Sequence, residues 1–479
     1  MAVVLRINDG GLDDLAEYTR QWMFDTLKEL KMDNFSHRFE RGLASGELIL
    51  SNLSITEFAP PLIKYRPHSN SLLYVTTVGG DAEIHADWFI NSNVLAALGI
   101  PLHGTATGKI TGFRSSVAVN VINSVDLIVH QCVARFNEFD LRLTGSLAAE
   151  ILHWFRNVIG RIMQARVEQA YCKIISEKLL IWLKTQLLKL PHRIQMNLGD
   201  DFQWIQTLHA IRPSESFIDL QMKNQFFSNG LLMEAVSAMP PETSSNIMYH
   251  EIPHTPHVLE VFMDEALLQE MLSTAHFSGE LVTNISSPFL RTDCDLLCLG
   301  KIVPELRHSL GKSALYAEVF TNEPPVVKLV TNRALIYMNV TFGLYQKVDE
   351  VLNAIDVYND AVVGVQPIKH PNQEPVIQIE IAGEAVVQAA LNEKHLDVDL
   401  NLHRSKGQLV STKIVGISQK TVDLILSMSV PFLENAASML LGNGINLSQV
   451  IDVPSQNESL HFETGFVHFL ADMNVRNLL

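Results

Sequence analysis

The chain has 479 residues, which is too long for one ordinary core and predicts two or more domains. Hydrophobic residues make up 47% and mean hydropathy is +0.13, but the longest charge-free run, 88–108, contains a proline and three glycines, so no membrane-spanning helix is expected. The net charge of −16 lies entirely in residues 201–479, since residues 1–200 hold 20 basic and 20 acidic residues, and an acidic chain excludes nucleic acid as the expected partner.

The first predicted element is an amphipathic helix over 11–31. Its apolar side recurs at three- and four-residue steps through Leu12, Leu15, Thr19, Trp22, Met23, Leu27 and Leu30. From 45 to 143 the period changes to two, as in 46–55 and 71–90. This alternation predicts several antiparallel strands curved around one apolar face.

A second, much longer helix is predicted over 146–190. It contains no proline, has only Gly160 inside, and ends at Pro191. At about 1.5 Å per residue it would be roughly 65 Å long, so it must lie along an elongated domain.

Residues 191–256 hold six prolines and are predicted to connect two halves, with strands at about 202–208 and 216–226. The order of elements then repeats. A strand at 258–262 leads into a helix at 264–274, alternating segments follow at 278–286, 314–344, 375–391 and 396–415, and a long helix spans 418–441. The two halves therefore share one plan, although their residue identity is poor.

Two motifs suggest chemistry and fail on context, and a third is absent. His250-Glu251-Ile252-Pro253-His254 matches the H-E-x-x-H zinc pattern, but Pro253 disfavours the helix that the pattern needs, so we interpret it as a surface loop. Residues 104–109 resemble a phosphate-binding loop one residue short and are predicted to form a hairpin turn. No G-x-S-x-G nucleophile motif occurs. We expect no catalytic residue, metal or cofactor.

The cysteines and sequons bear on the compartment. Cys132 lies in an alternating segment and Cys172 on the long helix; bridged, they would close a loop worth about 4 kcal/mol, and unbridged they would be two buried thiols. Cys294 and Cys298 could bridge only in a helical turn and stay undecided. No signal peptide is visible before Arg6, so either the numbering starts at the mature chain or the protein is cytosolic. The candidate glycosylation sites are Asn34, Asn52, Asn284, Asn339, Asn446 and Asn457.

Several segments together resemble the bactericidal/permeability-increasing protein family, which includes lipopolysaccharide-binding protein and the phospholipid and cholesteryl ester transfer proteins. They are the opening 3–12, the 40-residue cysteine spacing, 217–223, 323–327 and the closing 466–472. The resemblance spans essentially the whole chain through the order and spacing of these segments.

The resemblance implies an α+β boomerang: two barrels, each a twisted antiparallel sheet wrapped on a long helix, joined by a central sheet. It implies an N-terminal barrel at 1–200, a connection with central-sheet strands at 201–256, and a C-terminal barrel at 257–479 whose last strands return to the central sheet. It also implies secretion and a Cys132–Cys172 disulfide.

The family further implies one apolar lipid pocket in each half. The first is expected between helix 11–31 and the first half of helix 146–190, lined by Leu15, Thr19, Trp22, Met23, Leu27, Phe155, Ile159 and Met163. The second is expected between helices 264–274 and 418–441, lined by Phe262, Leu267, Leu268, Met271, Ile425, Met428 and Phe432.

The charge pattern departs from the lipopolysaccharide-binding members, which present lysine-rich tips on the first barrel. The corresponding stretch here, 81–99, contains no Lys or Arg. We therefore expect a secreted carrier of phospholipid or another acyl lipid, with lipoprotein or membrane surfaces as further candidate partners. A defence protein that binds lipopolysaccharide or microbial surfaces is the alternative.

Overall fold

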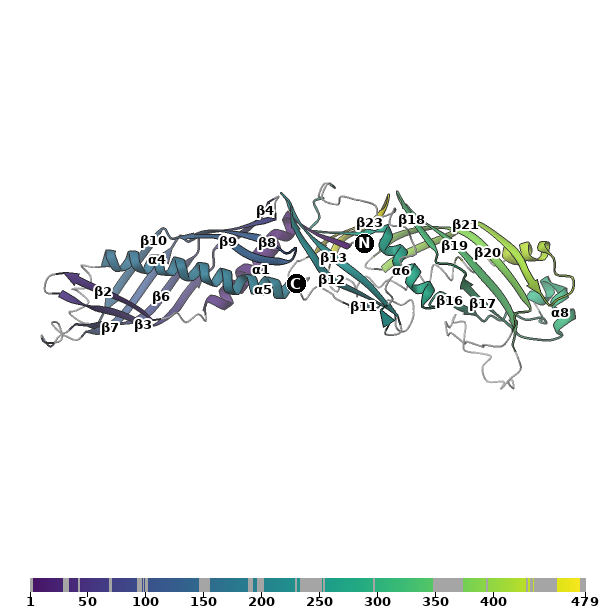
Figure 1. The fold of residues 1–479 in the computed structure, drawn as a ribbon, viewed down its shortest axis with the longest axis horizontal. Helices are drawn as coiled ribbons and strands as arrows, with labels where there is room; N and C mark the ends of the chain where they lie inside the picture. Colours follow the sequence, from purple (N-terminus) through teal and green to yellow (C-terminus); the bar gives the residue numbers. More distant parts are fainter. Residues whose placement is uncertain are drawn as a thin grey trace.

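The molecule is elongated and gently bent, with a lobe at each end and a sheet between them (Figure 1). The computed structural model describes residues 3–28, 34–41, 44–68, 71–92, 97, 99, 102–145, 156–187, 193–195, 202–228, 231–232, 252, 255–295, 298–347, 374–392, 395–427, 430, 434 and 455–473. No helix within these ranges is long and apolar enough to span a membrane.

The central sheet joins the two halves through the first strand of the chain. Its strand order is β11-β12-β13-β1-β15-β23-β22, with β14 paired to β13, and the pairs are antiparallel. The strands are β1 (Val3–Asn8), β11 (Arg193–Gln195), β12 (Gln203–Pro213), β13 (Phe217–Ser228), β14 (Leu231–Leu232), β15 (Leu259–Asp264), β22 (Ser455–Glu463) and β23 (Phe466–Met473). Strand β1 therefore lies between strands from both halves.

The N-terminal lobe consists of two sheets packed on two helices. One sheet has the order β10-β7-β6-β3-β2 and the other β4-β5-β8-β9. The strands are β2 (Phe35–Arg41), β3 (Ala44–Ala59), β4 (Leu62–His68), β5 (Leu72–Val78), β6 (Asp81–Asn91), β7 (His103–Thr111), β8 (Arg114–Ile122), β9 (Asp126–Arg135) and β10 (Glu138–Thr144).

The chain passes between these two sheets at four places, 60–61, 79–80, 112–113 and 136–137, which we call the seam. Gly80 and Gly112 have φ angles of +87° and +63°, which favour glycine. A Cβ on Gly80 would also lie 2.8 Å from the backbone nitrogen of Pro61. The segments of the seam are thus packed too closely for side chains at these glycines.

Helix α1 (Asp9–Lys28) confirms the first predicted helix but begins two residues earlier. Its buried residues recur on one side at Leu12, Leu15, Thr19, Met23 and Leu27. Gly10 in the first turn of the helix lies close to the segment before β15, because a Cβ there would lie 3.3 Å from the side chain of Val258.

The long helix is continuous over 156–187. It comprises α4 (Arg156–Ile174), the π-helical turn η1 (Ile175–Leu179) and α5 (Leu180–Leu187), which confirms the prediction within the described residues. A disulfide joins Cys172 on α4 to Cys132 on β9, with the two Cα atoms 5.8 Å apart. The helix is therefore covalently attached to the sheet that it covers.

The C-terminal lobe repeats the plan. Strand β15 leads into α6 (Glu265–Phe277), and a sheet of order β16-β17-β19-β20-β21 follows, with β18 paired to β19. Residues 419–427 are helical where the second long helix was predicted. The other elements are β16 (Val282–Ile285), α7 (Leu299–Ile302), α8 (Pro304–Leu310), β17 (Leu315–Thr321), β18 (Val326–Val330), β19 (Arg333–Gln346), β20 (Ile377–Asn392) and β21 (His395–Thr412).

The hairpin turn predicted for residues 104–109 is wrong, because this segment is the interior of β7. Its glycines are needed for close packing and not for a turn. A Cβ on Gly104 would lie 2.8 Å from the ring of Trp88, and one on Gly108 would lie 3.1 Å from the ring of Phe139.

Candidate functional site

An apolar cavity lies at the seam, between α1, α4 and the sheet that contains β3, β6 and β7. Its volume is about 80 Å³. Its lining is Met23, Leu27, Ile55, Phe58, Ala59, Pro61, Gly80, Asp81, Ala82, Ile84, Ile110, Phe113, Phe136, Val167, Ala170, Tyr171 and Ile174.

Helical periodicity explains which helix residues reach the cavity. Met23 and Leu27 are four apart on α1, so they share one face. On α4 the lining residues recur at steps of three, one and three over 167–174, which is again a single face. Apolar stripes on two helices therefore converge on the sheet at the seam.

The polar groups of the lining are satisfied within the protein. The hydroxyl of Tyr171 lies 3.1 Å from Ser115 Oγ, which lies 2.7 Å from Thr77 Oγ1. Burial raises the pKa of Tyr171, so its hydroxyl stays protonated. Asp81 is exposed and accepts a hydrogen bond from the backbone N–H of Gly112. The lining is thus suited to an apolar ligand.

The structure separates the predicted N-terminal residues. Met23 and Leu27 line the cavity, whereas Leu15 and Thr19 are buried elsewhere in the core, with Thr19 Oγ1 donating to the carbonyl of Leu15. Trp22 stacks on Trp182, with ring centroids 5.2 Å apart.

The expected contribution of the long helix is displaced toward its middle. The described lining from this helix is 167–174, so only Val167 falls in the predicted first half of 146–190 and the other lining residues lie just beyond its midpoint. Ile159 and Met163 belong to α4, but only their backbone is described, and Phe155 lies outside the described residues.

Sequence reasoning missed the lining residues that the strands supply. Phe113 and Phe136 lie at the seam, with ring centroids 5.2 Å apart, and Phe113 meets Tyr171 at 4.5 Å. The signal available was the recurrence of Pro60-Pro61, Gly79-Gly80 and Gly112 between alternating segments, because such residues mark where strands bend or cross.

The residues predicted for a C-terminal pocket do not form one group. Leu267 and Met271 of α6 are buried and Leu268 half-buried in the core that α6 shares with the central sheet. Ile425 is buried in a separate cluster at the far end of the lobe, with Val303 and Leu306 among its members.

Phe262 lies on the other face of the central sheet, which contradicts its placement with α6. Side chains alternate between the two faces of a strand. Phe262 lies directly opposite Val4 of β1, and these two side chains share a small buried cluster that is separate from the core around α6. Its ring stacks on His468 at 4.5 Å. Met428 and Phe432 lie outside the described residues.

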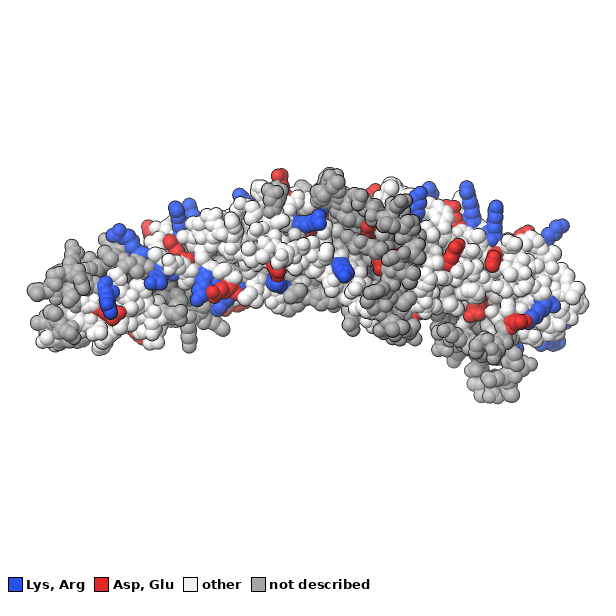
Figure 2. All heavy atoms as spheres, in the orientation of Figure 1, with Lys and Arg blue, Asp and Glu red and all other residues white. Residues whose placement is uncertain are grey.

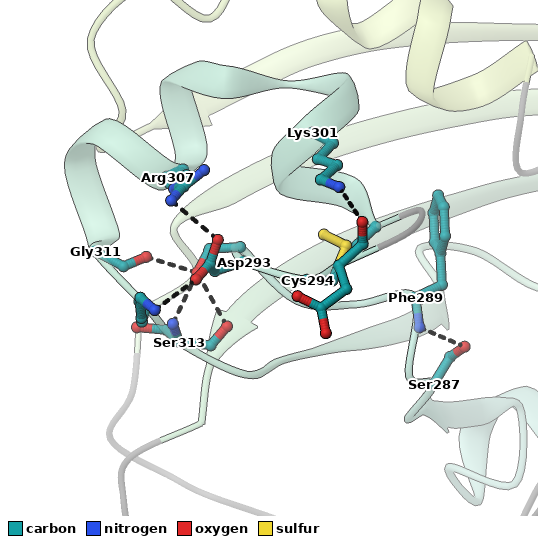
Figure 3. Close-up of a disulfide and its surroundings, with 12 residues drawn as sticks. Ser287, Phe289, Asp293, Cys294, Lys301, Arg307, Gly311 and Ser313 are labelled. Carbon is teal, nitrogen blue, oxygen red and sulfur yellow. Dashed lines mark hydrogen bonds and ion pairs between the residues drawn. A yellow bond between two sulfur atoms is a disulfide. The ribbon is translucent and has the colours of Figure 1, made fainter.

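A second disulfide, Cys294–Cys298, closes a short loop at the end of the C-terminal lobe, with Cα atoms 6.0 Å apart (Figure 3). Asp293 beside it accepts from Lys312 at 2.9 Å and Arg307 at 3.1 Å. The hydrogen bond from Lys312 lowers the pKa of the Asp293 carboxyl. The disulfide thus closes the loop next to the start of α7, and the ion pair of Asp293 with Arg307 connects the loop to α8.

The histidine motif is not placed, because His250, Glu251 and His254 lie outside the described residues. Among the residues that are described, no group of three or more His, Cys, Asp or Glu side chains could hold a metal ion.

The glycosylation candidates differ in exposure. Asn34, Asn52 and Asn457 are exposed, whereas Asn284 and Asn339 are half-buried. Asn446 lies outside the described residues.

Comparisons with known proteins agree with this architecture. A sequence model of the LBP / BPI / CETP family, C-terminal domain, matches residues 199–475, which is more than half of the chain. Eleven chains of solved structures match the fold. One is a crystal structure of lipopolysaccharide binding protein, with a TM-score of 0.54 and 15% identity over 98% of both chains. No curated protein matches the sequence.

Proposed function

Because the chain belongs to the LBP / BPI / CETP family, we propose that it carries phospholipid or neutral lipid, with an acyl chain held in the cavity at the seam. The apolar lining of that cavity is the observation on which the proposal rests. Each buried methylene contributes about 0.8 kcal/mol, so a chain of ~16 carbons would gain on the order of 12 kcal/mol before ordering costs. Burial alone is sufficient, and no catalytic group is required.

The size of the cavity adds a condition. A single water molecule needs about 10–15 Å³ of cavity volume. The cavity volume of about 80 Å³ therefore accommodates only a few methylene-sized groups. A full acyl chain therefore requires lining side chains such as Phe113 and Phe136 to move apart. The second pocket, near Leu267, Leu268 and Met271, remains part of the proposal.

Secretion is part of the same proposal. Two disulfides support it, since such bonds persist in oxidising compartments. Exposed sequons at Asn34, Asn52 and Asn457 add to this support.

Lipopolysaccharide is the second candidate ligand, because the solved protein of that name shares the fold. Lipid A would be expected to bind through its phosphates, and the stretch 81–99 offers no Lys or Arg for them. Competition between lipid A and phospholipid for the purified protein separates the two ligands.

The test is the lipid content of the purified protein. Ala170 lies in the cavity lining and Ala165 is exposed on the same helix. Ala170→Phe should fill the cavity and weaken the binding of phospholipid about 15-fold, which lowers the co-purified or reloaded amount, since displacing two methylenes costs ~1.6 kcal/mol. Ala165→Phe should retain the wild-type amount.

Lipid is extracted and quantified by mass spectrometry after exposure to phosphatidylcholine vesicles. Equal lipid in the two variants would exclude this cavity as the binding site. A wild-type protein that takes up no lipid would exclude the function.

A further inference from the structure

One end of the sheet β4-β5-β8-β9 carries an unusual outward-facing row. Leu62, Val78, Arg114 and Arg135 lie opposite one another on the four strands. Leu62 and Val78 are 69% and 55% exposed, and both arginines are exposed. In the next row Lys64 is exposed and Val133 is 40% exposed. We call these six residues the seam-end face.

Arg114 and Arg135 are expected to lower the folding stability of this sheet. Arg114 and Arg135 are direct cross-strand partners, and like charges in this position repel. Among the described residues neither arginine forms an ion pair. Two guanidinium groups held side by side can be stabilised by an anionic oxygen ligand such as a phosphate.

The sheet β4-β5-β8-β9 carries a net positive charge, although the net charge of the whole chain is −16. The face shown in Figure 2 has basic and acidic side chains interspersed with wide uncharged areas. Strands β4, β5, β8 and β9 contain four Lys and Arg residues and a single carboxylate, Asp126. Asp126 lies at the opposite end of β9 and pairs with Lys184.

The seam-end face borders the cavity along the chain. Leu62 follows Pro61, Arg114 follows Phe113 and Arg135 precedes Phe136, and these three neighbours all line the cavity. A surface held against this face would therefore lie next to the seam.

The other end of the same sheet is different. A polar groove there is lined by Arg66 and His68 together with the carboxylates of Asp9 and Glu215. Acidic groups thus accompany the basic ones at that end. At the seam end the strands of this sheet carry basic residues and no carboxylate, and the nearest acidic residues along the chain, Asp81 and Glu138, begin the adjoining strands β6 and β10.

We propose that the seam-end face docks on the surface of a membrane that contains anionic phospholipids. Arg114, Arg135 and Lys64 contact headgroup phosphates, while Leu62, Val78 and Val133 enter the interface between headgroups and acyl chains. This docking rests on the proposed lipid-carrier function, because it brings the seam cavity to the source of the acyl chain.

The test is binding to vesicles of phosphatidylcholine with or without phosphatidylglycerol, measured by co-sedimentation. Arg114→Gln with Arg135→Gln removes two charges from the face. Arg404→Gln with Lys406→Gln removes two exposed charges from β21 in the other lobe and is the matched control. Leu62→Ser with Val78→Ser tests the apolar part.

The arginine variant is expected to bind anionic vesicles about 30-fold more weakly, at roughly a factor of five per basic residue near the surface. The control should change less than twofold, and added salt should remove the difference. The Leu62/Val78 variant should weaken binding even at high salt. Thermal unfolding verifies that each variant is folded.

Three outcomes would overturn the proposal: unchanged binding in the arginine variant, an equal loss in the control, or a loss for a soluble polyanion such as heparin without a loss for vesicles. The first two leave the carrier function intact if the variants still load phospholipid. The Ala170→Phe experiment, conversely, can fail without affecting vesicle docking, so the two proposals fail separately.

Discussion

Arg6 is fully buried in the middle of the central sheet, where a charge is costly unless it is paired. Its Nε and Nη2 donate to the two carboxylate oxygens of Asp219 at 2.8 and 3.1 Å, and its Nη1 donates to the carbonyl of Ile252. The Phe217 ring centroid lies 3.7 Å from its guanidinium carbon. The charge is thus held by a bidentate pair and an aromatic face.

Glu260, on the neighbouring strand, is also fully buried and accepts several hydrogen bonds. Donors are Asn8 Nδ2 at 2.7 Å and the N–H and hydroxyl of Thr255 at 2.7 and 2.8 Å, and His468 Nε2 lies 3.0 Å away. Burial by itself raises the pKa of the Glu260 carboxyl. The hydrogen bonds outweigh burial and lower it to about 2.

This carboxyl predicts a loss of stability in acid. The folded pKa lies below the ordinary value of 4.5, so its stabilisation is complete above about pH 4.5 and disappears as the pH falls toward 2. The shift corresponds to about 3 kcal/mol. Glu260→Gln should remove this part of the pH dependence of the unfolding free energy, measured in urea between about pH 6 and pH 3. Glu17→Gln, at an exposed carboxylate, is the control; equal slopes in the two variants would contradict the prediction.

At the scale of elements, the sequence predicts the helices and strands in which one spacing of apolar residues is kept along the whole segment. The helices at 9–28 and 156–187 follow from the spacing of apolar residues, and the strands from alternation. Alternation does not say whether the chain turns back in one sheet or crosses to another. The seam was therefore not predicted, and glycines such as Gly104, which make room for the ring of Trp88, were mistaken for a turn.

The same limit applies to the candidate site. Met23 and Leu27 could be found because a helix stripe is visible in sequence. Phe113 and Phe136 could not, because their approach depends on strand pairings between distant segments. The position of a residue on the apolar side of a helix also does not show whether it lines a cavity. Thr19 lies on the same side of α1 as Met23 and Leu27, but its hydroxyl lies 2.6 Å from the Tyr65 hydroxyl in the core.

The two disulfides should differ in their contribution to stability. Cys132–Cys172 has a sequence separation of 40 and attaches the long helix to β9, whereas Cys294–Cys298 has a separation of 4. By loop-closure entropy the first is worth about 4 kcal/mol and the second about 2 kcal/mol. The Cys132→Ser/Cys172→Ser variant should therefore lose about twice as much unfolding free energy as Cys294→Ser/Cys298→Ser. Denaturant unfolding of both variants measures this, and a larger loss from the short loop would refute the loop-length argument.

At the scale of the whole molecule, the two lobes are not independent units. One continuous core contains residues of α1, α5, α6 and the central sheet. Arg6 pairs with Asp219, 213 positions away, and Asn8, two residues further along β1, donates a hydrogen bond to Glu260, 252 positions away. The repeat of elements predicts two halves, but the insertion of β1 between β13 and β15 is visible only in the structure.

Strand β1 should therefore couple the unfolding of the two lobes. Leu5 pairs with Leu220 on one side and Val261 on the other, so Leu5→Pro removes a ladder hydrogen bond from a central strand. The five tryptophans are Trp22, Trp88, Trp154, Trp182 and Trp204. Their fluorescence reports on the N-terminal half and β12, while far-ultraviolet circular dichroism reports on both halves.

In the wild type the two signals should change at the same denaturant concentration, as in a cooperative transition. In Leu5→Pro they should separate into two transitions, whereas Leu5→Ala, which keeps the backbone N–H, should shift both together. Coincident transitions in Leu5→Pro would mean that the continuous core couples the lobes without the β1 ladder. Separate transitions already present in the wild type would mean that the lobes fold as independent units despite their shared sheet.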